Sequence, residues 1–294
     1  MSPALDRRRS LTTFLPSEAV WSIGNRIGGF LKNMNDAWVS GIAYERFMGR
    51  WSNLVAQKFL SWLDVAPNRI WLDVGCGTGS LTGLILESYQ PKEIISIDSS
   101  SDFISHAQRS ITNSFAHFKV GLAQSLELDS NSIDAVVSGL VLNFVPQPKD
   151  AILEMLRVTK PGGKIGIFLW DYADGMQMLR YFWDAAVELD NNAREHDEGI
   201  RFPICRKGQL ESLIREVGLG QVEATAIEIK TVFQNFDDYW QPFLGKVGAA
   251  PRFLMSMDQK YRQKLEDKLR SSLPIGNDGS ISLYARAWVV KGTA

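Results

Sequence analysis

Residues 71–82, together with the lone acid Asp98, are the part of this 294-residue chain whose residue types and spacing predict chemistry. The apolar run at 70–74 is typical of a strand buried on both faces of a parallel sheet. Three glycines follow at alternate positions: Gly75, Gly77 and Gly79. Glycine lets a ligand approach the backbone closely, and a helix beginning near Ser80 presents unpaired N–H groups there. The segment therefore predicts a nucleotide-like ligand at the carboxyl end of this strand.

The spacing of the glycines narrows the class of nucleotide-like ligand that this turn can bind. A dinucleotide fingerprint, G-x-G-x-x-G, needs a glycine at the position of Ser80, and no phosphate-binding G-x-x-x-x-G-K-[ST] loop occurs in the chain. Residues 93–97 are typical of a second strand that leads to Asp98. A carboxylate at that point can accept hydrogen bonds from both hydroxyls of a ribose. An adenosyl group without a pyrophosphate satisfies both observations.

At these residues the chain resembles the class I S-adenosylmethionine-dependent methyltransferases, in particular the small-molecule and quinone-biosynthesis subgroup with a methyltransferase type 11 domain. The resemblance covers roughly residues 44–172, in the family's order. Four segments carry it: 72–79, 97–100, 134–138 and 157–163. The resemblance implies S-adenosyl-L-methionine as the cofactor.

The resemblance also implies roles for the methionine and ribose side of the site. Asp73 would orient the turn and the methionine amino group, while Gly75, Gly77 and Gly79 would line the methionine and ribose. Asp98 would hold the ribose hydroxyls. Ser138 ends the fourth strand, where backbone carbonyls face the sulfonium in relatives.

At the adenine end the chain departs from the family. Ser99 would flank the adenine, but Leu122 stands where the family often has an acid that contacts the adenine amino group. Adenine recognition would then depend on backbone N–H groups near Ala123 and on the side chain of Gln124.

The segment 44–52 resembles the part of relatives that closes over the cofactor. The hydroxyl of Tyr44 or the guanidinium of Arg50 would hold the methionine carboxylate, because an arginine fork binds carboxylates bidentately. Alternatively, Arg50 caps a helix end or forms an ion pair on the surface.

The acceptor is expected at the same sheet edge, and no catalytic residue is identified. Four candidates leave the fourth and fifth strands there: Asn143, Trp170, Asp171 and Tyr172. Histidine side chains can act as general bases near neutral pH, but for His196 we favour the alternative that it lies in a solvated polar loop at 190–200. The aromatic residues 181–183 are interpreted as core rather than pocket. Only Cys76 and Cys205 offer thiols, which argues against arsenite methylation, because that activity needs several thiols. No metal site is predicted.

The elements that must position these residues alternate between strands and helices. They predict an α/β fold with a Rossmann-like, doubly wound, mostly parallel seven-stranded sheet whose last strand is antiparallel. The expected strands are 70–74, 94–98, 117–121, 133–138, 164–170, 221–233 and 281–290. A helix or a helix pair is expected at 43–63, and the other expected helices are 80–88, 101–110, 149–159, 174–190, 207–217 and 257–272. Helical, aromatic cap insertions are expected at about 174–217 and 234–275.

Composition bounds the domain organisation and the class of partner. We expect residues 1–35 to be a poorly ordered extension and 36–294 to be one methyltransferase domain. The net charge of −1 argues against a nucleic-acid surface. Two cysteines and no apolar run of about eighteen residues indicate a cytoplasmic protein without a membrane span. The basic run 7–9 is also compatible with a transit segment. The oligomeric state is not predicted.

The sequence thus predicts methyl transfer from S-adenosylmethionine to a small apolar or aromatic acceptor, by in-line displacement driven mainly by proximity. Two alternatives stay open. One is a nicotinamide-dependent dehydrogenase on the same sheet, which Ser80 disfavours. The other is a non-catalytic subunit that binds S-adenosylmethionine.

Overall fold

The structure, a computed structural model, describes residues 45–245 and 247–294, all of which lie in one compact unit, Trp38–Ala294. The predicted extension at 1–35 and Tyr44 lie outside the described residues. The division at residue 36 and the boundaries of the cap insertions stay predictions. Within the described ranges, no helix is both long and apolar enough to cross a membrane.

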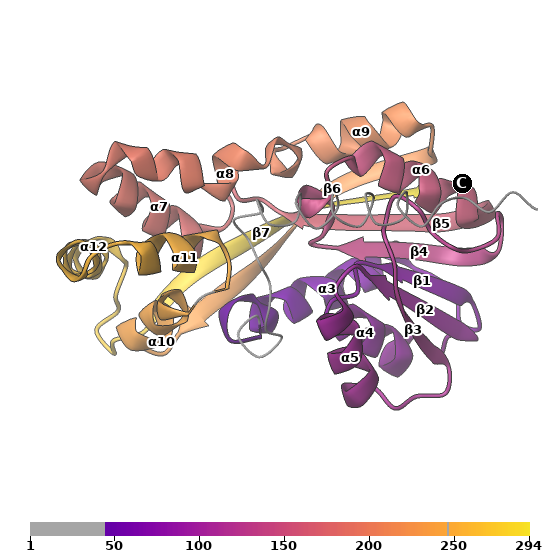
Figure 1. Cartoon of the computed structure of the whole chain (residues 1–294), viewed down its shortest axis with the longest axis horizontal. Coiled ribbons are helices and arrows are strands. Elements are labelled where there is room, and N and C mark those ends of the chain that lie inside the picture. Colours follow the sequence, from indigo (N-terminus) through magenta and orange to yellow (C-terminus); the bar gives the residue numbers. More distant parts are fainter. Residues whose placement is uncertain (1–44, 246) are drawn as a thin grey trace, which may run out of the picture. The chain divides into compact units, whose positions relative to one another are not determined.

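The described residues contain a single seven-stranded sheet with the order β3-β2-β1-β4-β5-β7-β6 (Figure 1). Its strands are β1 (Ile70–Val74), β2 (Glu93–Asp98), β3 (Ala116–Val120), β4 (Ile133–Gly139), β5 (Thr159–Trp170), β6 (Gly220–Phe233) and β7 (Ile281–Thr293). Strands β1 to β5 pair in parallel, and β7 is antiparallel to both β5 and β6. The predicted fold class is therefore confirmed.

Helices α4 (Ser80–Ser88), α5 (Ser101–Ser110) and α6 (Pro148–Val158) link parallel strands as crossovers. Helix α3 (Arg50–Leu63), which follows a π-helical turn at Glu45–Gly49, precedes β1, and α9 (Gln209–Val217) precedes β6. Local chemistry sets two of their starts. Ser100 caps α5 by accepting a hydrogen bond from the Phe103 N–H, and Pro148 occupies the first turn of α6, where no N–H is needed. The start of the strand expected at 164–170 was wrong: α6 ends at Val158 and β5 begins at Thr159, so the Pro-Gly-Gly at 161–163 lies within an irregular start of this strand.

The order of the strands reverses direction at β1. From β1 the chain moves outward to β2 and β3, and then returns to β4 on the other side of β1. Open α/β sheets bind ligands at such a switch point, outside the carboxyl ends of the strands. The glycine turn follows β1 directly, so the topology brings it to this point.

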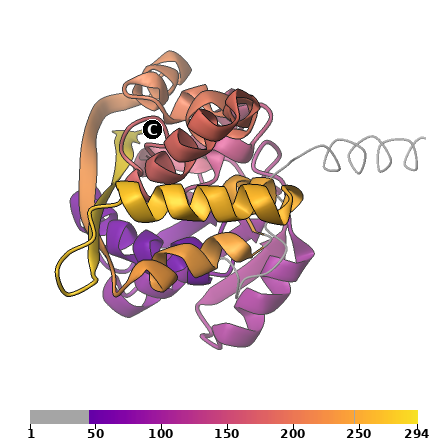
Figure 2. The same ribbon diagram turned by 90° about the vertical axis from the view of Figure 1, so that its left-hand side faces the viewer.

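Strands β6 and β7 extend beyond the carboxyl edge of the parallel strands. Trp170, the last residue of β5, pairs with Ala287, whereas β7 begins at Ile281, opposite Phe233 of β6. The projecting end supports a helical cap, seen at the left of Figure 1 and from its own side in Figure 2. The cap helices are α7 (Gln177–Leu189), α10 (Phe236–Trp240), α11 (Ala249–Ser256) and α12 (Gln259–Ser272).

Aromatic side chains fill the interior of this cap. Phe182 stacks on Phe243 with ring centroids 4.7 Å apart, and Trp183 packs against Phe253 at 5.4 Å. Phe182, Trp183 and Phe243 are fully buried. The interpretation of residues 181–183 as core is confirmed for Phe182 and Trp183, while Tyr181 is only partly buried. The cap therefore has a hydrophobic core of its own.

The predicted polar loop at 190–200 was wrong. The segment forms a 3₁₀ turn at Asn191–His196 and the short helix α8 (Glu198–Arg201). Asp197 is buried and pairs with Arg180, and buried Glu198 accepts a hydrogen bond from the indole of Trp183. These carboxylates find partners on α7, so the segment packs instead of remaining solvated. The ring of His196, partly buried, lies 5.2 Å from that of Phe253.

Candidate functional site

The glycine turn connects β1 to α4 at the switch point. Gly75, Gly77 and Gly79 all have positive φ angles, of 77°, 54° and 88°. The N–H groups of Gly75 and Cys76 both donate to the carbonyl of Ile97, at 2.7 and 3.0 Å, which ties the turn to β2. A Cβ on Gly75 would lie 2.5 Å from Val141, whereas one on Gly77 would meet nothing within 4 Å. Gly77 therefore presents open backbone that a ligand can approach.

Asp73 lies within β1 beneath this turn and is almost fully buried. Its Oδ2 accepts a 2.8 Å hydrogen bond from the Thr82 hydroxyl on α4, while Oδ1 has no hydrogen-bond partner. Burial, with a smaller contribution from the charge of Asp98, raises the pKa of Asp73 to about 7. A buried carboxylate oxygen without a partner suits a cationic group such as an amine. Thr82, which orients this carboxylate, was not singled out from the sequence.

Asp98 ends β2 beside the turn. Its Oδ2 accepts the N–H of Gly77 at 2.9 Å, and its Oδ1 accepts the N–H of Ser100 at 2.8 Å. Burial raises the pKa of Asp98, and the backbone hydrogen bonds oppose that rise. Each carboxylate oxygen has a second lone pair, so both can still accept a hydroxyl. Ser99 is exposed next to it. Asp98 thus joins the turn to the predicted ribose position.

The predicted adenine end is a tight turn after β3. The N–H of Ser125 donates to the carbonyl of Leu122 at 3.1 Å, so Ala123 and Gln124 form its centre. Both central residues are partly buried, whereas Leu122 is exposed. The N–H of Gly121 donates to the carbonyl of Asp98 at 2.9 Å. The turn therefore begins directly beside the strand end that carries the predicted ribose acid.

The carboxyl end of β4 closes the other side of the glycine turn. The buried hydroxyl of Ser138 donates to the carbonyl of Val74 at 2.8 Å and holds β4 against the end of β1. Leu140 has φ of 62°, a left-handed conformation that is uncommon for a side chain of this size. Strained backbone of this kind clusters at functional sites. The sequence contains no signal for it, because leucine is not typical of that conformation.

Arg50 is held by the cap. Its Nη1 lies 3.0 and 3.2 Å from the two carboxylate oxygens of Asp238. Its guanidinium also lies 4.3 Å from the ring centroid of Trp51 and 4.9 Å from that of Phe233. The ion-pair alternative therefore describes its observed contacts, and a role toward a cofactor carboxylate stays a prediction.

The residues after β5 form the wall between sheet and cap. Trp170 is buried at the end of the strand. Asp171 is also buried, and its Oδ2 accepts a hydrogen bond from Nε of Arg286 at 2.8 Å and forms an ion pair with Nη2 of the same residue at 2.8 Å. Its Oδ1 accepts the N–H of Asp174 at 3.1 Å. These contacts give Asp171 a structural role, and its predicted contact with substrate stays untested.

A cluster of three aromatic side chains lies at the same edge of the sheet. Phe202, which follows α8, lies 5.3 Å from Phe144 and 6.0 Å from Tyr172, measured between ring centroids. A Cβ on Gly199 of α8 would lie only 2.8 Å from the carbonyl oxygen of Tyr172, so glycine allows α8 to pack there. The Nδ2 of Asn143 is buried without a hydrogen-bond partner. Sequence reasoning missed Phe202, because nothing nearby in the chain marks it.

A separate cleft of about 800 Å³ lies between α7 and the segment 194–209. Its lining includes both charge types, among them Arg180, Asp184, Arg194 and Arg206. None of the predicted cofactor-binding residues lines it. The cleft therefore does not identify the methyl-transfer site.

Comparisons with known proteins agree with this geometry. Residues 72–167 match the family described as a methyltransferase domain. The chain is 30% identical over 144 residues to a malonyl-[acyl-carrier protein] O-methyltransferase of Marinomonas sp., covering 49% of this chain and 52% of that protein. It is 28% identical over 165 residues to a demethylmenaquinone methyltransferase of Lactobacillus johnsonii, covering 54% of this chain and 64% of that protein.

A solved structure shares the fold. Phosphoethanolamine N-methyltransferase 2 of Haemonchus contortus, in complex with S-adenosyl-L-methionine, superposes with a TM-score of 0.57 at 17% identity, covering 90% of this chain and 59% of that chain. The chain spans about half the length of the first curated relatives it matches. Residues 72–167 are therefore a methyltransferase domain, and the chain has the fold of the class I S-adenosylmethionine-dependent methyltransferases.

Proposed function

We propose that this chain is a methyltransferase that transfers a methyl group from S-adenosylmethionine to a small apolar or aromatic acceptor. The observation that carries the proposal is the buried Oδ1 of Asp73, which has no partner and lies beneath the open glycine turn. The methyltransferase domain match includes both features. A cofactor with an amino group needs a hydrogen-bond acceptor in the site, and the buried Oδ1 of Asp73 is available for this because it has no partner.

The residues of the turn fit that cofactor. Asp73 would bind its amino group, Asp98 its ribose hydroxyls, and the turn around Ala123 and Gln124 its adenine. When bound, S-adenosylmethionine supplies a methyl group that its sulfonium already makes electrophilic. The chain then needs to orient the acceptor and exclude water, so proximity is its main contribution.

The acceptor would lie against Phe144, Tyr172 and Phe202. Aromatic faces suit a planar apolar molecule, and the amide of Asn143 adds one hydrogen-bond donor. The name of the demethylmenaquinone methyltransferase indicates an acceptor of this type, which supports the proposal. Buried Trp170 and the Asp171–Arg286 pair would support this wall from behind.

Two further parts of the proposal rest on composition. The nearly balanced charge of the chain supports a small molecule rather than a nucleic acid as acceptor. Cys76 and Cys205 are both free thiols, which supports a cytoplasmic location.

The decisive experiment incubates the protein with S-adenosylmethionine labelled in its methyl group and a metabolite extract, followed by mass spectrometry. Label in an apolar or aromatic small molecule is the expected result, and label only in protein or nucleic acid would overturn the proposed acceptor class. A parallel titration compares NADH with S-adenosylmethionine, and binding of NADH alone would favour the dehydrogenase. Binding of S-adenosylmethionine without any labelled product would favour the non-catalytic subunit.

A further inference from the structure

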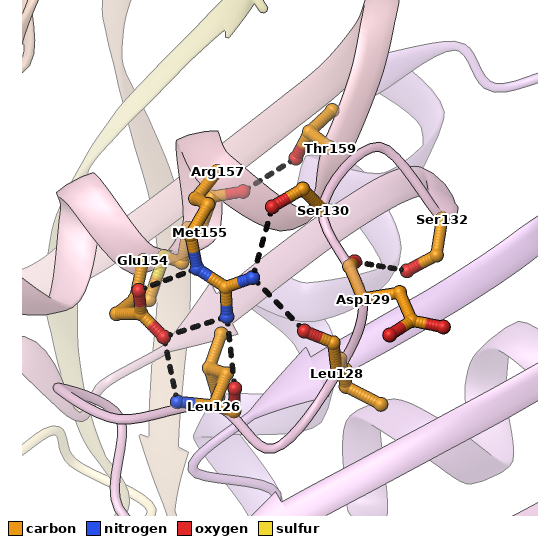
Figure 3. Close-up of polar contacts among 9 residues, drawn as sticks. All are labelled: Leu126, Leu128, Asp129, Ser130, Ser132, Glu154, Met155, Arg157 and Thr159. Carbon is orange, nitrogen blue, oxygen red and sulfur yellow. Dashed lines mark hydrogen bonds and ion pairs between the residues drawn. The ribbon is translucent and has the colours of Figure 1, made fainter.

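Arg157, near the end of α6, donates hydrogen bonds to four other residues (Figure 3). Its Nε and Nη2 donate to the two oxygens of Glu154, at 2.6 and 2.9 Å. Nη2 also donates to the carbonyl of Leu126 at 2.8 Å, and Nη1 donates to the carbonyl of Leu128 at 2.9 Å and to the hydroxyl of Ser130 at 3.2 Å. The planar fork of arginine can satisfy all these acceptors at once, which a lysine ammonium cannot do in this geometry.

Glu154 and Arg157 together bind both backbone polar groups of Leu126, in the segment between β3 and β4. Oε2 of Glu154 accepts the N–H of Leu126 at 2.8 Å, while Arg157 donates to the carbonyl of the same residue. The side chain of Leu126 is buried in the core. Both backbone groups and the side chain of Leu126 are therefore held.

This residue, Leu126, lies next to the predicted adenine turn. Leu126 directly follows the turn at 122–125, and Gly121 directly precedes it. At the start of the turn, the N–H of Gly121 donates a hydrogen bond to the carbonyl of Asp98. One end of the turn is thus tied to the strand of the ribose acid, and the other to Arg157 and Glu154.

Stability alone does not explain this arrangement. The side chains of Arg157 and Glu154 are 36% and 22% exposed, and ion pairs with such exposure contribute little to folding free energy. The bond to Arg157 holds the pKa of Glu154 below its ordinary value, so the pair stays ionised at neutral pH. What the pair does determine is the path of the backbone from 126 to 130.

We propose that Arg157 and Glu154 are positioning residues for adenine recognition, and this inference rests on the proposed function. They act through Leu126 to fix the backbone N–H groups near Ala123. A fixed N–H can donate to N1 of adenine, which is a bare acceptor. N1 of hypoxanthine carries a hydrogen and cannot accept, so a rigid turn discriminates between the two bases.

The test measures this discrimination by calorimetry, with S-adenosylhomocysteine and its hypoxanthine counterpart, S-inosylhomocysteine. Wild type should bind the adenine form about tenfold more tightly, the value of one good hydrogen bond. Arg157→Lys and Glu154→Gln should bind the adenine form about tenfold more weakly, while binding of the hypoxanthine form changes little. Arg215→Lys is the matched control, because Arg215 also pairs with a helical glutamate, Glu211, and donates to a carbonyl, that of Val222.

The outcomes separate the inference from the proposed function. If wild type binds neither S-adenosylmethionine nor S-adenosylhomocysteine, the proposed function fails, and the inference fails with it. If wild type binds and the variants keep the tenfold discrimination, or lose affinity for both ligands equally, only the positioning role is overturned. Thermal unfolding checks each variant, and Glu154→Gln, which keeps an acceptor oxygen, serves if Arg157→Lys does not fold.

Discussion

The hydroxyl of Thr82 donates to Oδ2 of Asp73 and leaves Oδ1 of that carboxylate buried without a partner. The pKa of Asp73 is raised to about 7, so the folded protein keeps the proton on this group up to a higher pH than the unfolded chain does. In the unfolded chain the group ionises at its ordinary pKa of 3.8. Its contribution to the free energy of unfolding therefore falls as pH rises from that value toward 7.

Cofactor binding should show the opposite pH dependence. A bound amino group stabilises the Asp73 carboxylate, so affinity for S-adenosylmethionine should rise between about pH 5.5 and 7, where an α-amino group stays largely protonated. Calorimetry at several pH values measures this trend. Asp73→Asn should bind more weakly and lose most of the rise. A pH-independent affinity in wild type would contradict the role of Asp73.

Gly77→Ala should abolish or strongly weaken cofactor binding, because its Cβ would occupy the space at the open turn. Gly162→Ala is the matched control, since Gly162 also has positive φ, of 75°, and open space around it. Each substitution should cost about 1–2 kcal/mol in unfolding free energy for the left-handed conformation. Only Gly77→Ala should change the Kd for S-adenosylmethionine. Equal effects of both variants on binding would remove the ligand role of the turn.

Asp98→Ala should weaken S-adenosylmethionine binding by about 1.5–3 kcal/mol for each charge-assisted hydrogen bond to the ribose that is lost. The change also frees the N–H of Gly77, so some loosening of the turn is expected. Asp102→Ala, in the exposed first turn of α5, removes a nearby charge without this contact and should leave the Kd unchanged. Unaltered affinity in Asp98→Ala would refute its assignment to the ribose.

Arg286→Ala should destabilise the fold by about 3–5 kcal/mol, because it leaves the buried carboxylate of Asp171 without its cation. Chemical denaturation measures the loss. Arg215→Ala, which breaks an exposed pair, should change stability by less than about 1 kcal/mol. The double variant Asp171→Ala with Arg286→Ala should lose less than the sum of the single losses. Additive losses would mean that the two residues do not act as a pair.

Phe202→Ala should raise the KM for the methyl acceptor by roughly tenfold, once an acceptor is known, because it removes one aromatic face of the proposed pocket. The Kd for S-adenosylmethionine should be unchanged. Phe115→Ala is the control, since that ring is 54% exposed. An unchanged KM would exclude Phe202 from the acceptor site.

The core of the fold was predictable because its signals are local. Short apolar runs bounded by turn residues located the strands, and the ends of α4 and α5 fell where predicted. The spacing of Gly75, Gly77 and Gly79 and the acid at Asp98 located the candidate cofactor site, because consecutive parallel strands end at one sheet edge.

The contacts of the cap and of several site residues depended on partners that are not their neighbours in the sequence. Arg50 pairs with Asp238, Asp171 with Arg286, and Asp197 with Arg180. Whether a charged side chain is available to a ligand depends on such a partner, because burial favours pairing over exposure to a site. Local spacing contains no information about these pairs.

The sequence by itself therefore determined the class of sheet, the edge that carries the candidate site and the adenosyl character of the predicted ligand. Tertiary structure decided which polar groups are left without partners, such as Oδ1 of Asp73, and which are already paired, such as Asp171. It also brought Phe202 to Phe144 and Arg157 to Leu126. The physical reason is that the geometry of a turn depends on residues adjacent in the sequence. The burial of a side chain and the choice of its partner depend on which other segments pack against it in the folded chain.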